Sequence, residues 1–172
     1  MAKDLGIQLI SSQPEYSMLW RVIEEEIIPV SKELGMSQIV WSPMAQGVLS
    51  GKYLPGHEIP KGSRGADPNG GADAISGFLT HDILSNVQQL SPIAEELGLS
   101  MAQLAIAWVL RNDNVSAALV GASRPEQIAE NVKASGVVLT AEIMQRIDEA
   151  LGDVIVRDPI ETAKRIPNER YS

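Results

Sequence analysis

The sequence predicts an α/β fold in which the strands form a parallel sheet. Three short apolar segments, at residues 7–11, 37–41 and 116–123, alternate with longer stretches whose apolar residues recur at helical spacing. Alternation of strands and helices is the pattern of a parallel sheet with helical crossovers. With 172 residues, 44% of them hydrophobic, the chain can form one domain with a sizeable core.

The first part of the chain is expected to hold two strands and one helix. Residues 7–11 read as a buried strand with a polar carboxyl end, and residues 37–41 read as the second strand. Between them, Pro29 has to lie near the start of the helix or kink it, and Gly35 ends it. The apolar face of this helix is expected to comprise Ile23, Ile27, Val30 and Leu34.

A long segment rich in glycine and proline follows, from residue 51 to residue 77. So many residues that break helices and strands predict an absence of regular structure there. Loops of this length are usually functional or disordered.

The second half is expected to be mostly helical. One helix carries an apolar face at Ile83, Val87, Leu90, Ala94 and Leu97 despite Pro92. Ser100 and Gln103 have the spacing of a capping box and predict the start of a helix over residues 101–112.

The third strand, at residues 116–123, leads into two further helices. Ser123 and Glu126 have the S-x-x-E spacing that starts a helix, which Gly136 ends. Thr140 then caps an amphipathic helix bearing Ile143, Ile147 and Leu151. Residues 156–172 are charged and interrupted by proline, and we expect them to form a peripheral tail.

Composition excludes several classes of function. The net charge of -8 argues against a nucleic-acid surface, and the absence of cysteine excludes disulfides and thiolate chemistry and favours a cytoplasmic location. No apolar run reaches the roughly 18 residues of a membrane-spanning helix, so membrane insertion is not expected. Neither metal-ligand spacing nor a common phosphate-binding glycine motif is present.

Polar or aromatic side chains follow each predicted strand, and ligands gather at the carboxyl ends of strands in α/β proteins. These positions are Gln13, Trp41 with Ser42, and Ser123 with Arg124. Each also has an ordinary interpretation: a loop residue for Gln13, a core aromatic for Trp41 and a helix cap for Ser123. Their coincidence, and a cation beside a helix amino terminus, favour an anion site.

The sequence also contains two notable cations and few candidate catalytic residues. Lys52 and Arg64 lie in or beside the glycine-rich segment, where they either hold an anion or are ordinary solvated charges. We do not expect His57 or His81 to be catalytic, and we interpret residues 24–26, all glutamate, as the solvated face of a helix.

Four segments in order together resemble the aldo-keto reductases. They are QPEYSML at 13–19, WSPMAQGVLSGKY at 41–53, AQLAIAWVLRN at 102–112 and VGASRPEQIAEN at 120–131. Within that family, the sequence is most similar to the voltage-gated potassium channel β-subunit group and its bacterial relatives. The resemblance implies a (β/α)₈ barrel that binds NADPH, with this chain forming strands six to eight and their helices.

The resemblance also implies roles for individual residues. Gln13 would bind the nicotinamide carboxamide and Trp41 would stack on the nicotinamide. The pyrophosphate would lie under a flap at residues 51–80, held by Ser42, the backbone around Met44 and Gln46, Lys52 and Arg64. The 2′-phosphoadenosine end would contact Ser123, Arg124, Gln127, Glu130 and Asn131.

By the same resemblance, the catalytic Asp, Tyr, Lys and His of the family lie on earlier strands. A full barrel takes about 250 residues, so we expect residues 1–172 to be a single partial domain, a fragment that is inactive alone. The parent would reduce small aldehydes or ketones with NADPH. The alternatives are an NADPH-sensing regulatory subunit and an inert remnant whose exposed strand edges pair with another chain, for example as a homo-oligomer.

Overall fold

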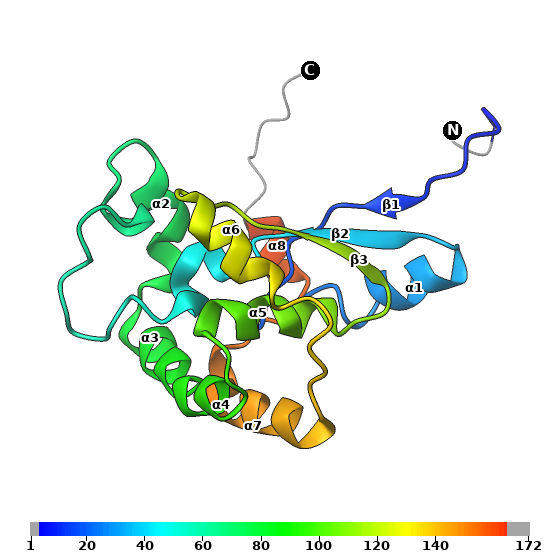
Figure 1. Ribbon diagram of the computed structural model, residues 1–172. Helices are drawn as coiled ribbons and strands as arrows, with labels where there is room; N and C mark the ends of the chain where they lie inside the picture. Colours follow the sequence, from blue (N-terminus) through cyan, green and yellow to red (C-terminus); the bar gives the residue numbers. More distant parts are fainter. Residues whose placement is uncertain (1–3, 165–172) are drawn as a thin grey trace.

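A computed structural model describes residues 4–164 and contains a three-stranded parallel sheet (Figure 1). The strands are β1 (Ser11–Ser12), β2 (Ser37–Trp41) and β3 (Val115–Leu119), in the order β1-β2-β3. Ser12 pairs with Gln38 of β2, and Trp41 of β2 pairs with Leu119 of β3. This confirms an α/β fold with three parallel strands and the predicted bounds of the second strand.

Helices occupy most of the remaining described chain. The α-helices are α1 (Ile27–Glu33), α2 (Gly71–Ile75), α3 (His81–Gln88), α4 (Ser91–Glu96), α5 (Met101–Leu110), α6 (Pro125–Val132), α7 (Ala141–Leu151) and α8 (Ile160–Lys164). Four 3₁₀ helices accompany them: η1 (Ala45–Ser50), η2 (Arg64–Ala66), η3 (Ser76–Phe78) and η4 (Gly152–Val154).

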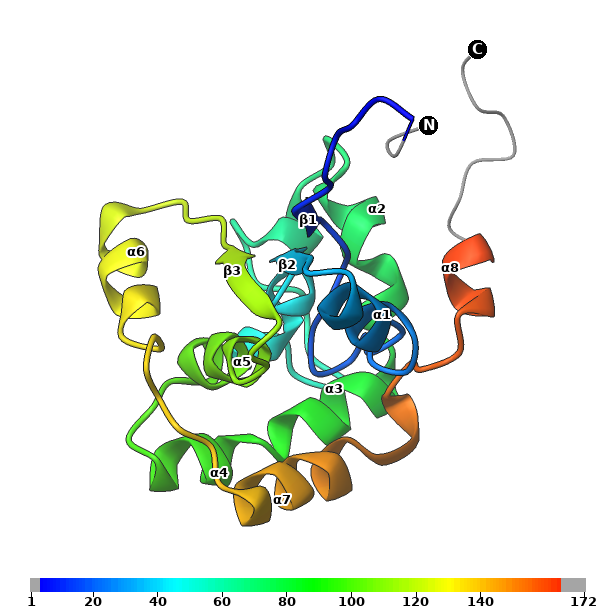
Figure 2. The same cartoon turned by 90° about the vertical axis from the view of Figure 1, so that its right-hand side faces the viewer.

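Helices α3, α4, α5 and α7 form layers on one side of the sheet, as Figure 2 shows. Helix α5 lies directly against the sheet, with α1 and α6 on its two sides, and α3, α4 and α7 lie beyond it. Because α5 has the sheet on one side and helices on the other, almost its whole length is buried, including Leu104 and Trp108. Helix α5 is therefore the centre of the core.

Two predictions about the first strand and first helix are wrong. Ile7 and Ile10 are 55% and 70% exposed, because β1 contains only two residues and forms an edge of the described sheet. Of the predicted inner face, Ile23 is buried, but Ile27 and Val30 of α1 and Leu34 just after it are exposed. Ile28 and Ser31 of α1 are buried instead. Pro29 does lie in the first turn of α1, as predicted.

The glycine-rich segment is not devoid of regular structure, contrary to the prediction. It contains η2, α2 and the start of η3. The glycines and prolines limit these helices to three to five residues each instead of preventing them. Gly71 has no room for a side chain, because a Cβ there would lie 2.7 Å from the carbonyl oxygen of Arg64.

The second half follows the prediction more closely. The predicted helix through Leu97 is two helices, since Pro92 lies in the first turn of α4 and cannot continue α3. The capping box of Ser100 and Gln103 and the Thr140 cap are both present. The third strand ends at Leu119, four residues earlier than expected.

The tail begins attached to the rest of the fold. The N–H of Arg21 donates to the carbonyl of Val156 over 2.8 Å, and the N–H of Val156 donates to the carbonyl of Leu19 over 2.8 Å. Residues 165–172 of the predicted tail lie outside the described residues. Between residues 4 and 164, no single helix is long and apolar enough to cross a membrane. The segment α3–α4 and the helix α5 would be long and apolar enough only if taken together, and the chain bends by 87° between them.

Candidate functional site at the strand ends

The parallel strands bring their carboxyl ends to one edge of the sheet, where the chain also forms α2 and α6 (Figure 1). Here the segment after β1 continues along β2: the N–H of Trp41 donates to the carbonyl of Pro14 over 3.0 Å, and the N–H of Tyr16 donates to the carbonyl of Trp41 over 3.2 Å. Gln13 and Trp41 are both exposed, and Trp41 is 39% exposed. An aromatic residue with this much free surface at a strand end is available to a planar ligand.

The turn after Trp41 has unusual backbone geometry. Ser42, Ala45 and Gln46 have φ values of 57°, 46° and 58°, in the left-handed region that residues other than glycine rarely adopt. Such conformations cost on the order of 1–3 kcal/mol each and cluster at binding and active sites. No local sequence pattern predicts these conformations, because none of the three residues is glycine.

Hydrogen bonds inside the turn use its backbone donors. The N–H of Ala45 donates to the carbonyl of Ser42, the N–H of Gln46 to Ser42 Oγ, and the N–H of Gly47 to the carbonyl of Met44. These N–H groups are therefore already occupied. A phosphate at this turn would depend on side chains, and less on the backbone around Met44 and Gln46 than the resemblance implies.

Two cations lie beside the turn. Arg64 donates from Nη1 to Gln46 Oε1, and Gln46 Nε2 donates to Ser42 Oγ over 3.2 Å. Lys52 Nζ approaches to 3.4 Å of the position that a Cβ on Gly47 would take. The structure therefore brings Ser42, Gln46, Lys52 and Arg64 together, although Arg64 is 18 residues from Gln46.

The flap that carries Arg64 is anchored to the core through Tyr53, which is 2% exposed. The N–H of Gly65 donates to the Tyr53 hydroxyl over 3.1 Å, and Gln88 Nε2 donates to the Tyr53 carbonyl over 3.0 Å. These bonds hold the flap at the carboxyl edge of the sheet.

A second group of predicted residues lies at the amino terminus of α6. The cap of α6 is Arg124 and not Ser123, because the helix begins at Pro125. Gln127 Oε1 accepts from the N–H groups of Ser123 and Arg124 over 2.8 and 3.1 Å. The glutamine four residues after Ser123 satisfies these donors, so Glu126 is not needed for this role. Ser123 and Arg124 are both exposed.

The last two predicted residues lie further along α6. The carbonyl of Glu130 accepts from Gln103 Nε2 over 2.8 Å, and its carboxylate accepts from Lys133 Nζ over 2.6 Å. Asn131 is partly buried. Glu130 thus connects α6 with α5, and both its carbonyl and its carboxylate already accept hydrogen bonds.

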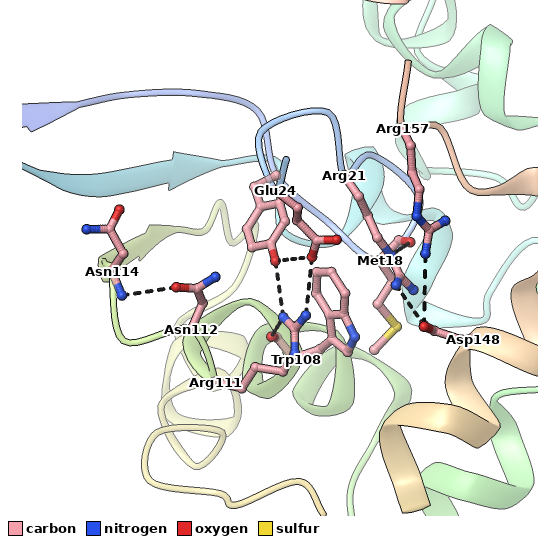
Figure 3. Close-up of polar contacts among 10 residues, drawn as sticks. Met18, Arg21, Glu24, Trp108, Arg111, Asn112, Asn114, Asp148 and Arg157 are labelled. Atoms are coloured by element: carbon pink, nitrogen blue, oxygen red, sulfur yellow. Dashed lines mark hydrogen bonds and ion pairs between the residues drawn. The ribbon is translucent and has the colours of Figure 1, made fainter. Parts of the chain in front are cut away.

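A partly buried cluster of charged side chains surrounds Trp108, and no local pattern in the sequence predicts it. The Trp108 ring lies between the guanidinium groups of Arg21 and Arg111, whose Cζ atoms are 4.5 and 3.8 Å from the ring centre (Figure 3). Arg111 also pairs with Glu24 over 3.2 Å, and Arg21 pairs with Asp148 over 2.7 Å. The prediction that residues 24–26 form a solvated face is wrong for Glu24, which is only partly exposed and pairs with Arg111.

The described residues offer binding groups and no evident acid–base centre. Among residues 4–164, no three His, Asp or Glu side chains are placed to hold one metal ion. His57 and His81 are both exposed. The arrangement suits an extended anionic ligand with a planar group, at the carboxyl ends of a parallel sheet.

Comparisons with known proteins identify the family of this α/β protein. The model of the Aldo/keto reductase family matches residues 1–151. The chain belongs to the aldo/keto reductase family.

Several relatives illustrate this membership. The chain is 44% identical over 142 residues to a probable voltage-gated potassium channel subunit beta of Oryza sativa subsp. japonica, covering 81% of this chain and 43% of the relative. It is 34% identical over 156 residues to L-glyceraldehyde 3-phosphate reductase of Escherichia coli (strain K12), covering 89% and 44%. The chain therefore spans less than half the length of these relatives.

A solved structure is similar in fold. The glycerol dehydrogenase of Gluconobacter oxydans superimposes with a TM-score of 0.66 at 23% identity, over 94% of this chain and 46% of that one. Oxidoreductases thus occur among both the sequence relatives and the structural neighbours.

Proposed function

We propose that this chain provides most of the cofactor cleft of an NADPH-dependent reductase of aldehydes or ketones. The observation that carries the proposal is the assembly of Trp41, the left-handed turn, Lys52 and Arg64 at the carboxyl edge of the sheet. In a chain with a net charge of -8, two cations at this edge favour a phosphate ligand. Bound NADPH would supply the hydride.

In this proposal β1, β2 and β3 are strands six to eight of a (β/α)₈ barrel, and residues 1–172 form one partial domain. Gln13 binds the nicotinamide carboxamide and Trp41 stacks on the ring. Ser42, Lys52 and Arg64 hold the pyrophosphate, while Gln46 orients Arg64. The expected cytoplasmic location and the carbonyl substrate belong to the same proposal.

The group on α6 would hold the other end of the cofactor. Ser123 and Arg124 lie at the amino terminus of α6, where the helix dipole and the exposed Arg124 guanidinium favour an anion. They would bind the 2′-phosphate, while Gln127, Glu130 and Asn131 line the adenosine. Of these, Arg124 is the residue that would distinguish NADPH from NADH.

A second candidate function is an NADPH-sensing regulatory subunit. Its support is the 44% identity to a protein described as a probable potassium channel subunit beta. The two functions share the cofactor cleft and differ in turnover. Measurable carbonyl reduction by the whole protein would favour the enzyme, and cofactor binding without turnover would favour the regulator.

Fluorescence titration of the 172-residue chain tests the proposal. Of the three tryptophans, Trp20 and Trp108 are buried and Trp41 is exposed, so NADPH should quench Trp41, and a Trp41→Phe variant should lose the response. Replacing Arg124 with Ala should weaken NADPH binding about tenfold or more, because a hydrogen bond to a charged group contributes about 1.5–3 kcal/mol. NADH binding should change little.

Arg146→Ala is the matched control, since Arg146 pairs with Glu96 in the outer helical layer. Equal losses for NADPH and NADH in Arg124→Ala would remove the 2′-phosphate role. No saturable binding of either nucleotide by the unaltered chain would contradict the cofactor cleft itself.

A further inference from the structure

The hydroxyl of Tyr16 is held by two charged residues from different parts of the chain. It donates to Glu24 Oε1 over 2.6 Å and accepts from Arg111 Nη1 over 3.1 Å, and the residue is fully buried. Glu24 and Arg111 also pair with each other over 3.2 Å (Figure 3). Tyr16, Glu24 and Arg111 thus form a group of three mutually bonded side chains, the Tyr16 triad.

Helix α5 provides a fixed support for the triad. Arg111 Nη1 donates to the carbonyl of Trp108 over 2.7 Å, and the Arg111 guanidinium stacks on the Trp108 ring. The Tyr16 ring itself contacts Trp108, with ring centres 5.1 Å apart. Trp108 is fully buried in the centre of the core, so the position of Arg111 is fixed by the most enclosed helix.

The backbone of Tyr16 is bonded to the candidate cofactor site. Its N–H donates to the carbonyl of Trp41, and Trp41 in turn donates to the carbonyl of Pro14. Gln13 lies three residues before Tyr16 in the sequence. A displacement of Tyr16 would therefore move both residues proposed to contact the nicotinamide.

Packing alone does not account for the triad. A phenylalanine would keep the ring contact with Trp108, and a partly buried ion pair adds little net stability because desolvation offsets the attraction. Directional hydrogen bonds, in contrast, select one position of the bonded groups. The triad is suited to setting the position of the segment that carries Gln13.

We propose that Glu24 and Arg111 are positioning residues for the nicotinamide end of the site, acting through Tyr16. This inference rests on the proposed function, since it assigns the nicotinamide to Gln13 and Trp41. The triad fixes residues 13–16 against β2, so that the Gln13 amide and the Trp41 ring are in place before the cofactor binds. Such preorganisation increases affinity by lowering the cost of ordering on binding.

Two ligands distinguish positioning from general stability. NADPH carries the nicotinamide, whereas adenosine 2′,5′-bisphosphate carries only the end assigned to α6. In Arg111→Met, NADPH affinity should fall about tenfold with less Trp41 quenching at saturation, while the bisphosphate should bind as before. Arg111→Lys keeps the charge and should restore part of the loss.

Tyr16→Phe provides a second variant if Arg111→Met does not fold. It removes one hydroxyl and leaves Glu24 paired with Arg111. The affinity for NADPH should therefore again fall while that for the bisphosphate stays unchanged, but by a smaller factor than in Arg111→Met. Arg146→Met, a cation in the outer layer, is the matched control and should change neither ligand. Circular dichroism of each variant confirms that the fold is retained.

The outcomes separate this inference from the proposed function. Equal weakening of both ligands, or no change in either, in folded Arg111→Met and Tyr16→Phe would overturn the positioning role and leave the cofactor cleft standing. If the unaltered chain binds the bisphosphate but not NADPH, the nicotinamide assignment is wrong and the inference is overturned with it. Absence of binding by either ligand would overturn both.

Discussion

Burial keeps the phenol of Tyr16 protonated well into the alkaline range. Desolvation raises its pKa above the usual value of about 10, the Glu24 carboxylate adds to the increase, and the Arg111 guanidinium acts in the opposite direction. Because the pKa is higher in the folded state than in the unfolded state, folding stability falls as pH rises. The stabilising contribution is complete below about pH 10 and is lost toward the raised pKa.

This pH dependence can be measured by urea unfolding at several pH values between about 9 and 11.5. The unaltered chain should lose stability relative to Tyr16→Phe as pH rises above about 10. Tyr53 and Tyr171 are common to both proteins, so the difference isolates Tyr16. Parallel curves for the two proteins would show that the Tyr16 hydroxyl ionises as readily in the folded state as in the unfolded state.

At the level of single residues, the sequence predicted which side chains lie at the strand ends and not how they are connected. Trp41 and Ser42 were identifiable because they follow a regular strand. The contact between Gln46 and Arg64 depends on the path of the flap, which no local pattern specifies. Tyr16 was visible only as part of a motif, since its partner Arg111 is 95 residues away.

Helix α5 depends on its amino-terminal cap. The N–H of Gln103 donates to Ser100 Oγ over 3.2 Å, and the Ser100 N–H donates to Gln103 Oε1 over 2.8 Å. Ser100→Ala should lower the free energy of unfolding by about 1 kcal/mol. Urea unfolding measures the change, and Ser135→Ala at an exposed position after α6 is the control. A loss no larger than that of the control would contradict the cap's contribution.

Elements were predictable where their signals are local. The caps of α5 and α7 were predicted correctly because each involves residues three apart. The inner face of α1 was predicted wrongly, since helical periodicity identifies an apolar face without specifying what covers it. Residues 7–10 also have a strand-like sequence, and nothing in the described structure covers them. The strand β1 contains only Ser11 and Ser12 and has one neighbouring strand in the described sheet.

The whole molecule exposes apolar surface at both edges of its sheet. Ile7, Ile10, Val30 and Leu34 are exposed on the β1 side, and Leu119, Ile128 and Val132 on the β3 side. Since all three strands are parallel, the β1 edge of one copy has the polarity to pair with the β3 edge of another. We propose that the 172-residue chain associates with copies of itself through these edges.

Sedimentation velocity over a range of concentrations tests this association. The average mass should rise with concentration, and a double variant, Val30→Lys with Leu34→Lys, should shift it towards the monomer. Leu54→Lys is the control, because Leu54 is equally apolar and exposed but lies in the flap. A monomer at every concentration would contradict the proposal.

The arrangement of the sheet also bears on how the chain folds. Gln38 of β2 donates to Asn114 beside β3 over 3.0 Å, although the two residues are 76 positions apart. Closing so long a loop is entropically costly, and native contacts between distant segments slow folding. We therefore expect α3, α4 and α5, which are consecutive in the sequence, to collapse first, and the β2–β3 pairing to form in the rate-limiting step. Substitutions at the Gln38–Asn114 contact would then slow refolding, whereas loss of the Thr140 cap would mainly accelerate unfolding.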